Sequence, residues 1–430
     1  MDLNEQQKKA IEHFKGPCLV IGTPGSGKTR VITERVRYLV EEKGVKNTNI
    51  LVITFTKAAA VQMKKRYESM MGDASKRVYF GTFHAIFFTI LKYAYHYTAD
   101  NIIRDDTKRQ ILKELINKED IEIQDENDFL NDIEGEISRV KGEMIELQHY
   151  YSPNCPGESF RRIFTGYQKA LQGRKLIDFD DMLVFTYELL SERPDILKMW
   201  QNKFRYILID EFQDINMIQY DIVKMLAGER QNVFSVGDDD QSVYGFRGAA
   251  PAIMKKFPED FHGTVIEYLN VNYRCSYDIV ECSKRIIQNN RDRYEKQLRS
   301  AFAAGQSDRV HIVKTDSMTE QNKKIIDRIT ELNRAGIPYR EMAIIFRTNT
   351  EPRALASKLM ENGIPFLMKD NIPNIFTHFL AENIFDYIRL ARGSRDRRTV
   401  LRIINKPNRY ISRDAFDSPV VNFEELRQNY

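Results

Sequence analysis

Residues 22–29 read G-x-x-x-x-G-K-T, a spacing that provides the groups needed to bind a phosphate chain. Backbone N–H groups at the glycines can surround phosphates, and the N-terminus of a following helix adds the positive end of its dipole. Lys28 can reach the β- and γ-phosphates, and the Thr29 hydroxyl can hold Mg²⁺. The predicted phosphate-binding residues are Gly22, Thr23, Pro24, Gly25, Ser26, Gly27, Lys28 and Thr29.

The residues around this loop favour a nucleotide site over a chance glycine turn. Residues 18–21 form a short apolar run, and residues 29–40 carry apolar side chains at helical spacing. A strand, a glycine-rich loop and a helix in this order are the context that the pattern requires. We therefore predict a nucleoside triphosphate site here.

A second apolar stretch ends in two acidic residues. Residues 204–209 predict a buried strand, and Asp210 and Glu211 follow it directly. Asp210 can hold the shell of a Mg²⁺ ion, whereas Glu211 can orient or deprotonate an attacking water. A surface acidic turn is disfavoured, because both carboxylates follow an apolar strand. We expect Lys28, Thr29 and Asp210 to meet at the tips of neighbouring strands.

A further predicted strand, residues 232–237, leads into a loop rich in aromatic and polar groups. Gln241, Tyr244, Phe246 and Arg247 lie close together in this loop. Bases stack on aromatic rings at about 1–3 kcal/mol each, and arginine pairs with phosphate. The loop predicts contact with single-stranded nucleic acid, and an aromatic loop that only packs is the alternative.

An amide precedes the phosphate loop. Residues 3–11 predict a helix start, with Asn4 as N-cap and Gln7 as the third helical residue. This capping box accounts for Gln7 by itself. An amide also suits the edge of adenine, because it donates and accepts hydrogen bonds at once. The pattern leaves both interpretations open.

Polar and aromatic residues also follow two other predicted strands, residues 50–56 and 77–81. In open α/β sheets, ligands bind at the carboxyl ends of strands. A core ring, a solvated lysine and a structural histidine are the plainer interpretations, and spacing alone favours them. The candidates are Phe55, Thr56, Lys57, Thr82, Phe83 and His84.

Strands that alternate with helices predict an α/β fold with a parallel sheet. Residues 265–269 and 342–349 predict two more strands, and residues 351–360 and 381–391 predict helices. We expect a second α/β unit to begin near residue 270, with few strands.

Residues 94–176 differ from the rest, because strand patterns are absent and charged helical patterns dominate. We predict an all-helical insertion here. Asp178 and Asp181 follow it and could suggest acid–base chemistry. Their spacing fits a helix N-cap and an acidic first turn better.

Composition excludes several classes of protein. The chain has 430 residues, 42% hydrophobic residues and a formal net charge of +4, which neither requires nor excludes a nucleic-acid partner. It contains no apolar run long enough to span a membrane and no secretory leader pattern. Its four cysteines form no C-x-x-C pair, which is typical of reduced thiols in a cytoplasmic protein.

Taken in order, these stretches resemble the superfamily 1A DNA helicases of the UvrD/PcrA/Rep type. The matching blocks are LNEQQKKAI, GTPGSGKT, ITFTKAAA, GTFH, LIDEFQDIN, VGDDDQSVYGFRGA, NYRCS and IIFRTNT. The resemblance covers nearly the whole chain, and the blocks DEFQD and GDDDQSVYGFRGA are highly specific.

The resemblance implies a role for each matching residue. Gln7 and Arg30 would line the adenine pocket, and Tyr273 would stack on the base. Gln241 would sense the γ-phosphate and couple it to DNA, and Arg274 would be an arginine finger. The phosphate loop and the two acids keep the roles given above. The residues implied along the DNA track are Phe55, Thr56, Lys57, Phe83, His84, Tyr244, Phe246, Arg247, Thr348 and Asn349.

The resemblance also implies an architecture and an activity. A first RecA-like motor domain would comprise residues 1–93 and 177–268, with a helical insertion at 94–176. A partial second RecA-like domain would comprise residues 269–370, and a second helical insertion would begin at 371–430. The implied activity is 3′-to-5′ translocation on single-stranded DNA and single/double-strand junctions, driven by ATP and Mg²⁺ as the motor domains close.

Some features depart from the family pattern. Lys57 stands where relatives often have asparagine, and Phe246 where many have tryptophan; both keep a DNA contact feasible. Later family motifs, including a second γ-phosphate arginine, have no counterpart, so the chain resembles the amino-terminal part of a helicase. An ATP- and DNA-binding module without productive turnover is therefore an alternative. A P-loop ATPase acting on something other than nucleic acid is another.

Overall fold

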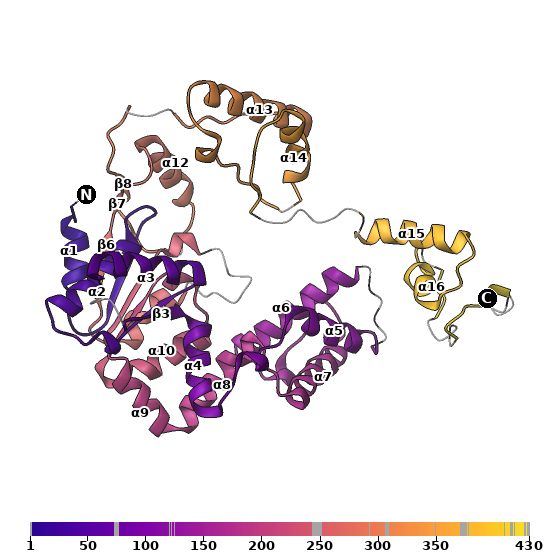
Figure 1. Ribbon diagram of the computed structural model, residues 1–430, viewed down its shortest axis with the longest axis horizontal. Helices are drawn as coiled ribbons and strands as arrows, with labels where there is room; N and C mark the ends of the chain where they lie inside the picture. The colour runs from indigo at the N-terminus through magenta and orange to yellow at the C-terminus, as the bar shows by residue number, and fades with distance from the viewer. Residues whose placement is uncertain are drawn as a thin grey trace. The chain divides into compact units, whose positions relative to one another are not determined.

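The computed structural model forms two compact units, residues 1–310 and 311–430 (Figure 1). The first unit contains a parallel sheet with helices on both faces, and the second contains helices with two small apolar cores. The structure describes residues 2–72, 77–119, 121, 123, 125–242, 252–291, 293–305, 309–348, 350–369, 376, 378–407, 409–412, 416, 418–424 and 427.

Six parallel strands form the central sheet, in the order β3-β2-β4-β5-β1-β6. Four of them, β1, β2, β4 and β5, are buried along their whole length, as expected for strands covered on both faces. The parallel α/β fold predicted from the sequence is confirmed. The strands are β1 Cys18–Gly22, β2 Ile50–Thr54, β3 Tyr79–Thr82, β4 Tyr206–Ile209, β5 Val233–Gly237 and β6 Val265–Leu269.

Helices cover the two faces of this sheet in separate layers (Figure 1). Along β1, Leu19 and Ile21 pack toward α4 and α8–α11, whereas Cys18 and Val20 pack toward α1–α3. This alternation follows from the two-residue period of a strand. The helices are α1 Glu5–Glu12, α2 Lys28–Glu41, α3 Lys57–Met71, α4 Phe83–Tyr95, α8 Phe179–Glu192, α9 Pro194–Lys203, α10 Met217–Ala227 and α11 Ala252–Asp260.

The predicted caps of α1 and α8 are confirmed. The Asn4 side chain accepts from the backbone N–H of Gln7, and the Gln7 side chain accepts from the backbone N–H of Asn4. Asp178 and Asp181 form the same reciprocal pair at the start of α8. The two aspartates therefore cap a helix, as their spacing predicted.

An all-helical segment separates β3 and α4 from α8, as predicted. It contains α5 Asp105–Ile116, α6 Glu126–Gly142 and α7 Gly157–Arg174, which enclose their own apolar core. Lys141 on α6 is buried between Asp178 and Asp181, with its Nζ 2.7 Å from an oxygen of each. Tyr167 on α7 donates to Asp178 at 3.0 Å. A buried ionic joint thus links the helical segment to the first helix that follows it.

Residues 271–300 add a small parallel pair of strands beside the main sheet, β7 Val271–Asn272 and β8 Arg299–Ser300. The helix α12 Tyr277–Ile287 connects them. The second unit contains α13 Met318–Arg334, α14 Pro352–Glu361, α15 Phe379–Ala391 and α16 Arg397–Ile403. None of the helices in the described ranges is long and apolar enough to cross a membrane.

The prediction of a strand at residues 342–349 was wrong. Residues 342–348 form no strand in the structure, and Asn349 lies outside the described residues. Ile345 is 93% exposed. An apolar run becomes a strand only when a neighbouring strand pairs with its backbone, and the described residues provide no such neighbour here.

Candidate nucleotide-binding site

The phosphate loop connects β1 to α2 with its backbone in the conformation that only glycine adopts readily. Gly25 and Gly27 have φ values of +66° and +84°. Ser26 turns the loop back on itself, because its N–H and its hydroxyl both donate to the carbonyl of Thr23. The first turn of α2 therefore begins directly after a tight glycine-rich loop, which is the arrangement that binds phosphate.

Gly22 leaves the space that Lys28 occupies. A Cβ atom at Gly22 would lie 2.5 Å from Cγ of Lys28, so a larger residue would displace the lysine. The Lys28 side chain is only 10% exposed, and its Nζ lies 3.7 Å from an oxygen of Asp238. The lysine is thus folded back over the loop, where a phosphate chain would meet it. Thr29 follows it in the first turn of α2.

Asp210 lies at the end of β4 with a buried carboxylate. Its Oδ1 has no hydrogen-bond partner within the described part of the chain, and the side chain is almost inaccessible to solvent. Burial, and then the nearby charge of Glu211, raises the pKa of Asp210 to about 7, while Lys28 opposes this shift. A buried anionic oxygen without a partner is strongly suited to a cation.

Glu211 and Asp214 extend this acidic tip. Glu211 has φ +52°, a left-handed conformation that turns the chain sharply at the strand end. Gln213 donates to carboxylate oxygens of Glu211 at 2.9 Å and of Asp214 at 3.2 Å. Burial, and then the charge of Glu211, raises the pKa of Asp214 to about 6.

The expectation that Lys28 and Asp210 lie on neighbouring strands was wrong. The sheet order places β5 between β4 and β1, so Asp238 and Gln241 lie between the two sites. Gln213 connects the residues after β4 to those after β5, because its Oε1 accepts from the N–H of Asp238 at 2.9 Å. Gln241 donates to Asp238 at 2.6 Å. Three strand tips, rather than two, therefore form the site.

Helix α1 and the strand β7 close the other side of the loop. Gln7 is buried and donates to the carbonyl of Ser26 at 3.0 Å. Tyr273 donates its backbone N–H to Gly25 at 3.0 Å, and its hydroxyl accepts from Asn4 at 2.7 Å. The base-binding residues implied by the resemblance therefore gather around the phosphate loop.

Arg274 lies against the loop as well. A Cβ atom at Gly25 would lie 2.9 Å from Cβ of Arg274 and 2.7 Å from Oδ1 of Asn272. Asn272 is buried, and its Oδ1 accepts from the backbone N–H groups of Arg274 and Cys275. Sequence reasoning did not single out Asn272, since only the fold shows that its side chain holds the backbone of Arg274 and Cys275.

These residues fit a nucleotide and a Mg²⁺ ion. The cradle at Gly22, Gly25 and Gly27 has no room for side chains, and Asp210 presents an unpaired carboxylate oxygen. Thr29 and Asp210 supply the hydroxyl and carboxylate oxygens that Mg²⁺ prefers. When bound there, Mg²⁺ would neutralise phosphate charge.

Comparison with known proteins identifies the family. Residues 3–262 match the UvrD/REP helicase N-terminal domain, and residues 267–424 match the UvrD-like helicase C-terminal domain. The first match alone covers more than half of the chain. The chain belongs to the UvrD/REP helicase family. The resemblance to the UvrD/PcrA/Rep type is thereby confirmed, and the sheet is of the RecA-like type.

Staphylococcal proteins are among the relatives. A protein of Staphylococcus epidermidis (strain RP62A) named "ATP-dependent DNA helicase PcrA" is 33% identical over 422 residues, which is 95% of this chain and 56% of the relative. A protein of Staphylococcus aureus (strain Mu50) with the same name is 33% identical over 424 residues, with the same coverage. The chain therefore spans 56% of the length of these relatives.

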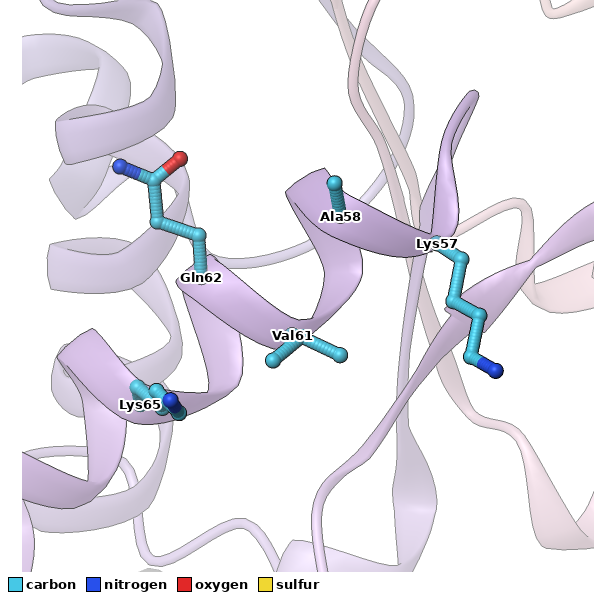
Figure 2. Close-up of a pocket in the computed structure, with 5 residues that line it drawn as sticks. All are labelled: Lys57, Ala58, Val61, Gln62 and Lys65. Atoms are coloured by element: carbon cyan, nitrogen blue, oxygen red, sulfur yellow. The ribbon is translucent and has the colours of Figure 1, made fainter.

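Two groups of the residues that the resemblance implied for DNA contact follow β2 and β3, and they differ in exposure. Thr56 caps α3 by accepting from Ala59 at 3.1 Å, and Lys57 follows it on the surface. Figure 2 shows α3 side chains that line a shallow hollow. The volume of this hollow is about 560 Å³. Its lining residues are Lys57, Ala58, Val61, Gln62 and Lys65.

Phe83 and His84 are less accessible. Phe83 is 2% exposed and packs on Phe87, so its ring belongs to the core rather than to a surface. His84 contacts the partly exposed ring of Phe179 edge-on at 5.4 Å, and burial lowers its pKa despite the opposing charge of Asp180. Sequence reasoning did not identify Phe179, which offers an exposed ring beside a candidate residue.

Of the remaining DNA candidates, Phe55 is half-buried directly after β2, Thr348 lies in the second unit, and four lie outside the described residues. Thr348 is exposed in the second unit, with its hydroxyl 3.2 Å from that of Thr350. Tyr244, Phe246, Arg247 and Asn349 lie outside the described residues.

Proposed function

We propose that this chain binds ATP and single-stranded DNA as part of a 3′-to-5′ DNA helicase or translocase. One observation carries the proposal. Lys28, in the helix that follows β1, pairs with Asp238 after β5, Asp238 also accepts from Gln241, and the unpaired carboxylate of Asp210 follows β4, the next strand of the sheet.

The side chains suggest how the phosphates are handled. Lys28 would leave Asp238 and neutralise the β- and γ-phosphates. Glu211, held by Gln213, would accept the proton of an attacking water. Arg274 would place a positive charge beside the γ-phosphate. Where an arginine finger acts, it raises the rate of hydrolysis by about 10³–10⁵. Gln7, Arg30 and Tyr273 would hold the base.

The DNA would cross the surface formed by the strand ends beyond β2 and β3. We include Phe55, Thr56, Lys57 and His84 in this track, with Tyr244, Phe246, Arg247, Thr348 and Asn349 from the resemblance. We leave out Phe83, because its ring is buried. The domain limits given by the resemblance, with motor domains at 1–93 plus 177–268 and at 269–370 and helical insertions at 94–176 and from 371, stay a prediction, as do junction substrates.

The test is ATP hydrolysis with and without a single-stranded oligonucleotide. We expect stimulation by the oligonucleotide, loss of hydrolysis in Lys28→Ala, and oligonucleotide binding that weakens steeply as salt rises. Binding of both ligands without turnover would instead support a binding module. An ATPase that ignores oligonucleotides at every salt concentration would contradict a role on DNA.

A further inference from the structure

A lysine outside every motif named above contacts the acidic residues that follow β5. Lys296 has a side chain that is 1% exposed, and its Nζ lies 2.6 Å from carboxylate oxygens of Asp238, Asp239 and Asp240. Burial disfavours its charge, but the three acids outweigh burial and raise the pKa of Lys296. The ammonium therefore occupies the space among three carboxylates that could otherwise suit a metal ion.

The neighbours of Lys296 fix it in this place. Arg293 forms a two-point ion pair with Asp240, through its Nε at 2.7 Å and its second guanidinium nitrogen at 2.5 Å. The backbone N–H of Tyr294 donates to Asp239 at 2.6 Å. The segment 293–296 is thus attached to the residues after β5 by charge-assisted hydrogen bonds, which are the strong ones.

Asp238 connects this cluster to the phosphate loop. Its Oδ1 faces Lys296, whereas its Oδ2 accepts from Gln241 at 2.6 Å and lies 3.7 Å from Nζ of Lys28. The Asp238 side chain is fully buried. When Lys28 turns to a phosphate, Asp238 loses one cation, and a buried carboxylate without a cation is costly.

We propose that Lys296 is a positioning residue of the nucleotide site: it neutralises Asp238, so that Lys28 can exchange Asp238 for a phosphate at low cost. It also fixes the carboxylate that orients Gln241. This inference rests on the proposed function, because it assumes that Lys28 binds a triphosphate.

The test compares two buried lysines. Lys296→Met and Lys141→Met each remove an ammonium from between aspartates, but Lys141 lies in the joint to the helical segment. Both variants should unfold at lower temperature. Only Lys296→Met should weaken binding of ATP with Mg²⁺, by about 5- to 150-fold, the usual range for coupled sites. Lys296→Arg keeps the charge and should stay close to the original chain in ATP affinity.

Binding is measured by calorimetry at a temperature where circular dichroism shows every variant folded. Equal affinity in Lys296→Met and Lys141→Met would overturn the inference. If Lys296→Met does not fold, Arg293→Gln replaces it. Without Arg293, Asp240 would attract Lys296 away from Asp238, and ATP affinity should fall. Unchanged ATP affinity in Arg293→Gln would therefore also overturn the inference. Absence of ATP binding in the original chain would instead refute the proposed function.

Discussion

At the scale of single residues, the buried carboxylate of Asp210 lowers the stability of the folded chain while no ligand is bound. Its buried carboxylate has a pKa raised to about 7 from an ordinary value of 3.8. Between these two values, the folded chain binds more protons than the unfolded chain. Stability is therefore lost as the pH rises from about 4 to about 7.

Asp210→Asn should remove this loss of stability. We expect the free energy of unfolding at pH 8, without nucleotide, to rise by about 2–4 kcal/mol relative to the original chain. The difference should shrink as the pH falls from about 7 to about 4, because Asp210 becomes protonated in the folded chain, and it should vanish below 3.8, where the unfolded chain is protonated as well. Urea denaturation at several pH values measures it, and a variant that is less stable at pH 8 would contradict this account of Asp210.

Gly22 provides a second residue-scale prediction. Gly22→Ala places a Cβ atom 2.5 Å from Cγ of Lys28, so the lysine must move. We expect ATP affinity to fall at least about tenfold, which is about 1.4 kcal/mol. The control is Gly135→Ala on α6, where nothing lies within 4 Å. It should gain about 0.5–1 kcal/mol in stability and keep its ATP affinity. Equal affinities in the two variants would refute the prediction.

The sequence was informative about residues whose role follows from local spacing. The phosphate loop, the acids after β4 and the caps at Asn4 and Asp178 could all be read from neighbours in the chain. Lys296 and Asn272 could not, because their partners are long-range and depend on the fold. For Phe83, spacing favoured a core ring and the resemblance implied a DNA contact, and its burial agrees with the core ring.

At the scale of elements, the joint between α6 and α8 holds the helical segment. Lys141→Met leaves Asp178 and Asp181 buried without their cation. We expect the free energy of unfolding to fall by about 3–5 kcal/mol, measured by urea denaturation. Arg193→Gln removes an exposed pair with Asp195 and should leave stability unchanged. A similar small effect of both changes would show that the joint contributes little.

Elements with a buried pattern on both faces were predicted well. Strands such as β2 and β4 each lie between two other strands of the sheet and are buried along their whole length. A continuous apolar run is typical of such a strand. The run at 342–349 also begins with apolar residues, but residues 342–348 form no strand in the structure. Composition shows that a segment can pair, whereas pairing itself depends on which other segments reach it.

At the scale of the molecule, the first unit carries every contact to the phosphate loop described above. The contacts come from α1, from Asp238 after β5 and from residues 272–274, all before residue 310. A chain ending at residue 310 should therefore bind ATP, and Lys28→Ala should abolish that binding. Equilibrium dialysis with labelled ATP measures it. A folded shortened chain without ATP binding would show that residues after 310 are required.

The central claim is that Lys28, Thr29 and Asp210 together hold a triphosphate and its metal ion. Calorimetric titration of ATP, with and without Mg²⁺, into the original chain and the variants Lys28→Ala and Asp210→Asn tests it most directly. We expect tight binding that depends on Mg²⁺ in the original chain, no measurable binding to Lys28→Ala, and binding to Asp210→Asn that Mg²⁺ no longer strengthens. Equal, Mg²⁺-dependent binding to all three chains would contradict it.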